Sequence, residues 1–222
     1  MAVTLRDGIY GQYYGNDFTS SESLLYPQME LNATYIYSAL APKGWTVNAI
    51  AGMLGNMQAE SSINPGRWQS DSVNWLEGGY GLVQWTPTTK YTNWIRENGY
   101  ADPSEMDANL YRILWEVENN EQWIATSDYP MSFKEFSTSN LTVSELSKAF
   151  LLCYERPADQ SESVQNLRAS LGEAWYEYLT GVEPIQPGSK TTRKKGYKWV
   201  LFNPRRRRVI WIKNNSHKLW MI

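Results

Sequence analysis

Two residue types that build disulfide frameworks and metal centres are almost missing from this chain. Its 222 residues hold one cysteine, Cys153, and one histidine, His217. A single cysteine excludes an internal disulfide framework, and we expect Cys153, which follows two leucines, to be a small buried apolar residue. Because residues 1–189 contain no histidine, a zinc peptidase built on two or more histidines is excluded, and we expect neither metal nor cofactor.

Long apolar runs are also missing. No segment approaches the roughly 20 consecutive apolar residues that span a bilayer, so we expect no membrane-spanning helix. The first residues lack the charged-then-apolar pattern of a signal peptide. We therefore expect that this chain does not cross a membrane by means of its own leader.

Charge is present but unevenly distributed. The whole chain has 21 basic and 23 acidic residues, a formal net charge of −2. From Lys190 onwards there are 11 basic residues and no acidic one, which leaves 10 basic and 23 acidic residues in 1–189, a formal −13. This division predicts an acidic domain and a basic tail suited to an anionic partner, such as teichoic acid, nucleic acid or an acidic neighbouring subunit. Because no nucleic-acid module is recognisable in the tail, an assembly or interdomain segment is the plainer alternative.

The pattern of apolar residues favours a mainly α fold. Helical spacing predicts helices over about 28–41, 48–61, 104–119 and 161–180. Two further helices are indicated by their ends: one is framed by Thr86 as N-cap, Pro87 at the first position and Gly99, and one begins at a capping box opened by Thr142 and runs through Tyr154. The expected organisation is an arm at 1–27, a helical domain at 28–181, a linker at 182–196 and a basic tail at 197–222 that can form a short hairpin.

One helix ends on an acid. Thr46 is the expected N-cap of a helix over 48–61, and Pro65 prevents its continuation. Its apolar residues recur at helical spacing: Val47, Ile50, Ala51, Leu54 and Met57. Glu60 falls at the edge of this apolar stripe, where the partial negative charge of the helix terminus and the loss of water both favour its protonated form. A general acid needs that form at neutral pH, although a polar residue that merely finishes a helix is the plainer alternative.

A glycine-rich segment follows about twenty residues later, with the sequence Gly78-Gly79-Tyr80-Gly81-Leu82-Val83-Gln84-Trp85. Its glycines allow the backbone to approach a ligand closely, and a glutamine and a tryptophan follow that can bind and stack.

Together these segments resemble a known family. Glu60-Ser61, followed by Gly-Tyr-Gly-Leu-Val-Gln, resembles the signature of goose-type lysozymes and lytic transglycosylases. The wider pattern resembles the lysozyme domain of bacteriophage tail-tip proteins, including the cell-wall-degrading tail knob proteins of the φ29 group. That pattern comprises residues 52–61, residues 81–87 and Tyr154-Glu155-Arg156-Pro157, and the resemblance covers roughly residues 28 to 180.

The resemblance implies a lysozyme-like fold and a glycosidase activity. The expected reaction is cleavage of the β-1,4 bond between N-acetylmuramic acid and N-acetylglucosamine of bacterial peptidoglycan, with Glu60 as general acid. The expected setting is a virion, where the protein would lie at the phage tail tip beside other tail proteins and digest the host wall during entry. Two alternatives stay open: a non-catalytic structural or wall-binding tail module, and an endolysin released at lysis.

The second carboxylate is not fixed by the sequence. Inverting hydrolysis needs a base about 6.5–9.5 Å from the acid. The acids between Ser61 and Tyr100 are Asp71, Glu77 and Glu97. We expect Asp71 first and Glu77 second as the catalytic base, with a solvated loop acid as the equal alternative for each. A base elsewhere would be Glu116 or Glu155. Without a base, Glu60 acts alone and the 6-hydroxyl of muramic acid attacks internally, as in a lytic transglycosylase.

The remaining site residues follow from the resemblance. The expected substrate-binding residues are Ser61, Tyr80, Gly81, Gln84, Trp85 and Tyr154. Trp68, Trp75 and Trp85 can stack on sugar rings, although a tryptophan is more often a core residue. For Gln84 the alternative is hydrogen bonding within the loop. We expect Glu155 and Arg156 to form a structural ion pair.

Overall fold

The computed structural model describes residues 5–6, 9–10 and 26–181. Near the N-terminus, β1 (Leu5–Arg6) pairs antiparallel with β2 (Ile9–Tyr10), with Leu5 opposite Tyr10. Most of the predicted arm at 1–27, the linker at 182–196 and the basic tail at 197–222 lie outside the described residues.

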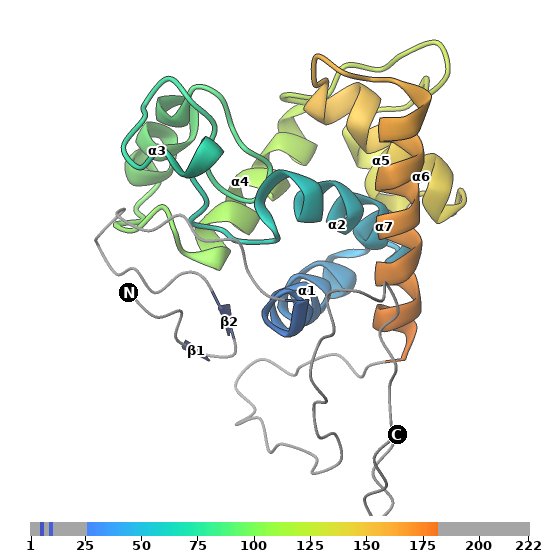
Figure 1. Ribbon diagram of the computed structural model, residues 1–222, viewed down its shortest axis with the longest axis horizontal. Coiled ribbons are helices and arrows are strands. Elements are labelled where there is room, and N and C mark those ends of the chain that lie inside the picture. The colour runs from blue at the N-terminus through green and yellow to red at the C-terminus, as the bar shows by residue number, and fades with distance from the viewer. Residues whose placement is uncertain (1–4, 7–8, 11–25, 182–222) are drawn as a thin grey trace, which may run out of the picture. The chain divides into compact units, whose positions relative to one another are not determined.

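The rest of the described chain consists of helices joined by loops, which confirms the mainly α fold class (Figure 1). The α-helices are α1 (Tyr26–Leu40), α2 (Val47–Ser61), α3 (Thr88–Glu97), α4 (Met106–Asn119), α5 (Phe133–Thr138), α6 (Val143–Ala149) and α7 (Glu162–Thr180). Two short 3₁₀ helices, η1 (Ala41–Lys43) and η2 (Gln69–Asp71), and the π-helical η3 (Phe150–Glu155) complete the set. Within the described part of the chain, every helix is too short or too polar to cross a bilayer.

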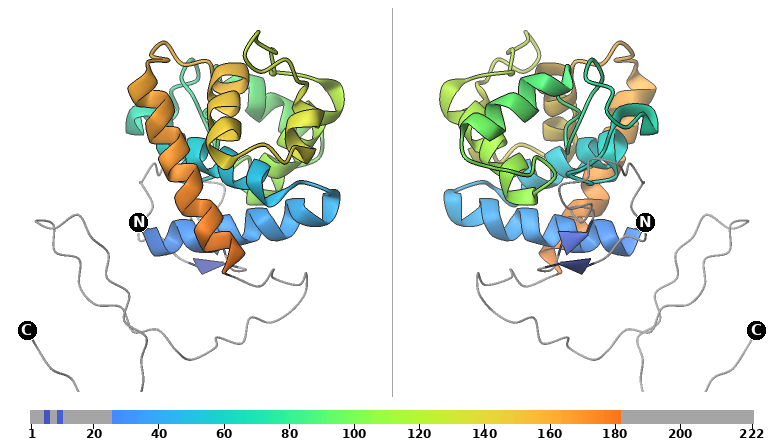
Figure 2. Two further views of the ribbon diagram at one scale, coloured as in Figure 1. Left: turned by 90° about the vertical axis from the view of Figure 1, so that its right-hand side faces the viewer. Right: turned by 90° about the vertical axis from the view of Figure 1, so that its left-hand side faces the viewer.

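Helix α2 runs through the core. Every residue from 49 to 57 is buried, which is why this helix carries little polar surface. It packs against α6 and α7, and both views in Figure 2 show α7 crossing it. The close approach depends on glycine, because a Cβ at Gly55 would lie 2.6 Å from the carbonyl oxygen of Arg168 and 2.6 Å from the nitrogen of Gly172. Helix α2 is therefore packed closely on α7, and it lies between α3–α4 on one side and α5–α7 on the other (Figure 1).

Several helix boundaries differ from the sequence predictions. Helix α3 begins at Thr88, because Pro87 is extended (φ −67°, ψ 159°) and occupies the N-cap position instead of the first turn. The capping box at Thr142 and Glu145 is confirmed, but the helix it opens changes to π-helical geometry at Phe150. Helix α5 was not predicted, although Ser132 and Glu135 form a second capping box at its start.

Candidate active site

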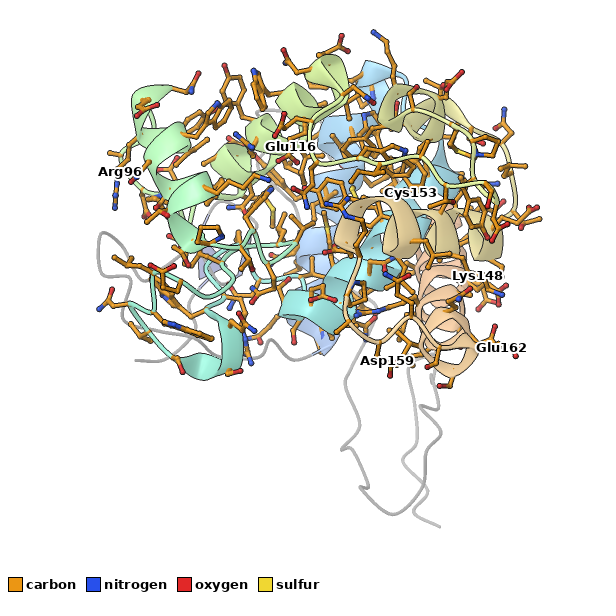
Figure 3. The ribbon with its side chains drawn as sticks, turned by 90° about the horizontal axis from the view of Figure 1, so that it is seen from above. Arg96, Glu116, Lys148, Cys153, Asp159 and Glu162 are labelled. Atoms are coloured by element: carbon orange, nitrogen blue, oxygen red, sulfur yellow. The ribbon has the colours of Figure 1, made fainter. Side chains whose placement is uncertain are left out.

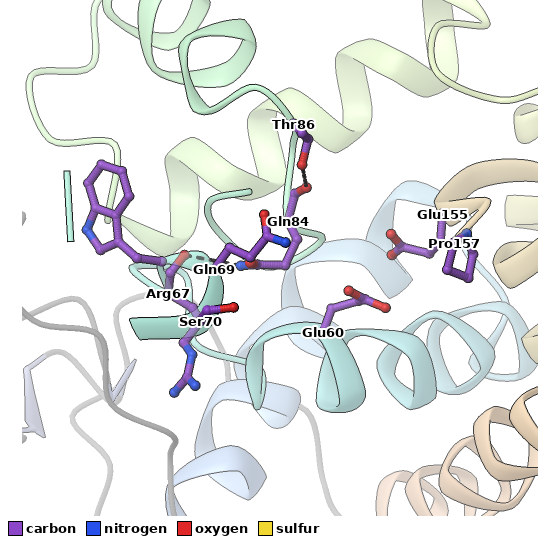
Figure 4. Close-up of a pocket in the computed structure, with 9 residues that line it drawn as sticks. Glu60, Arg67, Gln69, Ser70, Gln84, Thr86, Glu155 and Pro157 are labelled. Atoms are coloured by element: carbon purple, nitrogen blue, oxygen red, sulfur yellow. Dashed lines mark hydrogen bonds between the residues drawn. The ribbon is translucent and has the colours of Figure 1, made fainter. Parts of the chain in front are cut away.

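A pocket of about 250 Å³ opens at the end of α2 (Figure 4). Three segments build it: the last turn of α2, the loop that leads to α3, and the end of η3. Its lining residues are Glu60, Arg67, Trp68, Gln69, Ser70, Gln84, Thr86, Glu155 and Pro157. Most of these side chains are polar, so the pocket is suited to a ligand rich in hydroxyl and amide groups.

Glu60 reaches the pocket because α2 ends abruptly behind it. Ser62 takes the left-handed conformation (φ 56°), and its backbone N–H donates to the carbonyl oxygens of Gln58 and Met57, which closes the helix. The Glu60 side chain keeps 22% of its surface exposed. The helix end thus fixes the backbone of Glu60, while its carboxyl group stays partly exposed to the pocket.

Arg168 of α7 contacts Glu60 from the protein side. Its Nη2 lies 2.5 Å from Oε1 of Glu60, and its Nη1 donates to the carbonyl oxygen of Asn56 at 3.1 Å. The guanidinium therefore offsets both the carboxylate and the partial negative charge of the helix end. The sequence prediction considered only unfavourable neighbours of Glu60 and missed Arg168, which lies 108 residues away in the chain.

A second carboxyl group faces Glu60 across the pocket. The side chain of Glu155, at the end of η3, points toward that of Glu60 (Figure 4). Burial, followed by the negative charge of Glu60, raises the pKa of Glu155 well above its usual range. Its Oε1 is buried and has no hydrogen-bond partner.

The predicted ion pair between Glu155 and Arg156 is wrong. Arg156 takes the left-handed conformation (φ 48°), and its Nη1 donates to the carbonyl oxygens of Gln122 at 2.5 Å and Cys153 at 2.7 Å. Arg156 therefore stabilises the end of η3, and Glu155 faces the pocket without an ion pair to Arg156.

The glycine-rich loop forms the wall opposite Glu155. Gly81 has φ 83°, and a Cβ there would lie 2.7 Å from Oδ1 of Asn109, which also accepts from the backbone N–H of Leu82 at 3.0 Å. Ser61 is buried and donates to the carbonyl oxygen of Leu82 at 2.8 Å. Gly81 and Ser61 therefore shape the loop and tie it to α2, and neither lines the pocket as a binding residue.

Gln84 lines the pocket and also stabilises the loop. Its Nε2 donates to the carbonyl oxygen of Arg67 at 3.1 Å and to that of Gly81 at 2.9 Å. The hydrogen bonding within the loop is therefore confirmed for Gln84, and sugar binding by this residue stays a prediction.

Three aromatic residues that the sequence placed in the cleft are core residues instead. Tyr80 is 0%, Tyr154 1% and Trp85 3% exposed, and none lines the pocket. Trp85 stacks on Tyr91 at a centroid distance of 4.4 Å. Of the other tryptophans expected to stack on sugars, Trp68 lines the pocket, whereas Trp75 is 45% exposed outside its lining.

Behind the pocket, Glu116 of α4 joins the two walls. Glu116 is fully buried in the interior of the domain (Figure 3). For comparison, Arg96 lies at the edge of the domain in the same view. Glu116 accepts from Nε1 of Trp85 at 3.0 Å and from the hydroxyl of Tyr154 at 2.5 Å. It also accepts from Nε of Arg112 at 2.8 Å. Burial raises the pKa of Glu116, and these three donors act in the opposite direction. The Glu116 carboxyl group thus binds Trp85, which follows Gln84, and Tyr154, which precedes Glu155. It does not reach the pocket, so it cannot act there as a base.

This geometry can be compared with known proteins. Residues 31–179 match the phage tail lysozyme family. The chain belongs to that family. It is 49% identical over 164 residues to Morphogenesis protein 1 of Bacillus phage B103, an alignment that covers 74% of this chain and 43% of that protein. The chain therefore corresponds to less than half the length of this curated relative.

In this member of the phage tail lysozyme family, the acids first considered as bases have separate positions. Glu77 and Glu97 are exposed and do not line the pocket, in agreement with solvated side chains. The backbone of Asp71 ends η2, next to the lining residues Gln69 and Ser70, while its side chain is outside what the structure describes. Among the described residues, no group of three or more histidine, cysteine or acidic side chains is arranged to hold a metal ion.

Proposed function

We propose that this chain is a peptidoglycan glycosidase that cleaves the β-1,4 bond between N-acetylmuramic acid and N-acetylglucosamine. The observation that carries the proposal is the position of Glu60, a fixed carboxyl group with an open tip in a polar pocket. Membership of the phage tail lysozyme family supports the class of reaction.

The pocket residues have distinct roles in this reaction. Glu60 protonates the glycosidic oxygen as the bond to the leaving sugar breaks. Arg168 holds Oε1 of Glu60, so the carboxyl group keeps one orientation toward the substrate. Gln84 and Arg67 present polar groups to the sugar, whereas Trp68, which is 2% exposed, supports this wall from the core.

The proposed setting is the tail of a phage particle, at the tip, where the enzyme would open the host wall during entry. The family description and the similarity to a phage morphogenesis protein support this setting. Other tail proteins would then be its partners, with an anionic partner for the basic tail. A released endolysin remains the alternative of the same chemistry, and immunodetection in purified particles separates the two.

Digestion of purified cell walls tests the activity directly. We expect the wild-type protein to release muropeptides, and we expect the Glu60→Gln variant, which is nearly isosteric but has no acidic proton, to release none. Mass spectrometry of the products distinguishes reducing ends, made by a hydrolase, from anhydro ends, made by a lytic transglycosylase. A folded wild-type protein that releases no product would instead support a structural or wall-binding module.

A further inference from the structure

Among the residues that the structure describes, no hydrogen bond or ion pair explains why Glu155 lies in the pocket. Its Oε1 is buried and unpartnered, and the arginine next to it in sequence donates to backbone carbonyls. A buried polar atom without a hydrogen bond destabilises the fold. A glutamine at position 155 would have nearly the same size and would avoid the cost of burying a charge, so packing alone does not require a glutamate here. Such groups gather at functional sites, where a perturbed carboxyl group has a task.

The charges around Glu155 come from four elements. Glu60 faces it from α2, and Arg168 approaches from α7. Smaller contributions come from Glu116 on α4 and from Arg156 after η3. Of the two positive groups, Arg168 is bound to Glu60 and Arg156 to the backbone of η3, so neither forms an ion pair with Glu155.

We propose that Glu60 and Glu155 share one proton, and that Glu155 is a positioning residue that keeps this proton available to Glu60. The inference rests on the proposed function. Two carboxyl groups that face one another cannot both ionise easily, so the first ionisation makes loss of the remaining proton harder. Arg168 fixes one oxygen of Glu60, and Glu155 keeps the proton within the pair.

The shared proton fits both reactions that remain open for this site. In the resting pair one carboxyl group is protonated and the other is ionised. Glu60 passes the proton to the glycosidic oxygen while the bond from that oxygen to the anomeric carbon breaks, which leaves two negative charges. The attacking hydroxyl, of water or of the muramic acid itself, forms the new bond to the anomeric carbon and returns its proton to the pair. The doubly charged pair is a stronger base than a single carboxylate, so this return is favoured.

The pH dependence of wall cleavage tests the inference. We expect the alkaline limb of the Glu155→Gln profile to lie about one pH unit or more below that of the wild type, at least a tenfold loss of proton affinity, because the pocket then lacks the carboxyl group that holds the proton. Activity at acidic pH should persist in the same variant. The control is Glu173→Gln, which removes the same charge from the exposed surface of α7 and should leave the profile unchanged.

A reciprocal measurement does not depend on that variant folding or on activity. Carbon NMR of the carboxyl groups should show Glu155 titrating at lower pH in Glu60→Gln than in the wild type. An unchanged titration of Glu155 would overturn the inference, as would coincident alkaline limbs or loss of activity at every pH in folded Glu155→Gln. If the wild type itself cleaves no wall, the proposed function fails and the inference falls with it, whereas a cleaving wild type with coincident limbs overturns the inference alone.

Discussion

At the scale of single residues, the charge environment of Glu60 decides how the site works. Arg168 is 9% exposed and Glu60 22%, so their ion pair is only partly screened by water. The arginine stabilises the ionised acid, whereas the proposed reaction requires a proton on it. A second carboxyl group in the same pocket supplies a physical means of keeping that proton close.

Glu60→Gln should lower stability slightly while it abolishes activity. If only the partial negative charge at the end of α2 is considered, a neutral side chain at position 60 is expected to leave stability unchanged or to raise it. Arg168 reverses that sign, because the amide oxygen still accepts a hydrogen bond but no longer balances a nearly buried charge. We expect the free energy of unfolding to fall by about 1 kcal/mol. Urea unfolding of both proteins measures this, and a more stable variant would show that the ion pair contributes nothing.

Asp71 and Glu77 can now be separated by experiment. If Asp71 holds the attacking water, Asp71→Asn should slow hydrolysis by about 10²–10⁴-fold, the usual contribution of a general base. Glu77→Gln serves as the matched control and should stay within a few-fold of the wild type, because Glu77 is exposed outside the pocket. Rates of muropeptide release measure both. Near wild-type rates for both variants and for their double variant would remove this loop as the source of the base.

At the scale of elements, local signals predicted what local physics determines. Caps, prolines, glycines and periodicity located the α-helices other than α5 to within a few residues, and the capping box at Thr142 is one example. They did not reveal that Tyr80, Trp85 and Tyr154 are buried, because burial depends on which elements close over them. The sequence offered Glu155 both as a partner of Arg156 and as a base, and only the fold shows that Arg156 donates to backbone carbonyl groups instead.

The contact between α2 and α7 gives a prediction at this scale. In Gly55→Ala the new methyl group would meet backbone atoms of α7 at 2.6 Å, so the helices must separate. Overpacking of this kind destabilises by about 1–3 kcal/mol. Gly181→Ala is the control, because its Cβ would have no neighbour closer than 3.5 Å. Chemical unfolding should show a large loss for the first variant alone, and equal midpoints would mean that α7 yields easily.

At the scale of the whole molecule, the described domain combines a strongly acidic composition with acids buried in its interior. Glu30, Glu116 and Glu155 all have raised pKa values, with burial as the largest cause in each. Composition alone indicated the excess of acidic residues in 1–189, but it did not indicate which of these residues are buried in the folded domain. The protonation of these groups therefore links the stability of the fold to the pH at which it must work.

Glu30 on α1 makes this link measurable. Burial raises its pKa from 4.5 to about 7, so the folded state binds the proton more tightly than the unfolded state does. The resulting stabilisation is fully present below pH 4.5 and is lost as the pH rises through about 7. Glu30→Gln removes this dependence, so relative to the wild type the variant should be more stable at about pH 8 than at about pH 5. Thermal midpoints at both pH values measure the difference, with exposed Glu177→Gln as the control. This prediction would be wrong if the thermal midpoints of wild type and Glu30→Gln differed by the same amount at both pH values. Glu30 would then titrate as an exposed acid does.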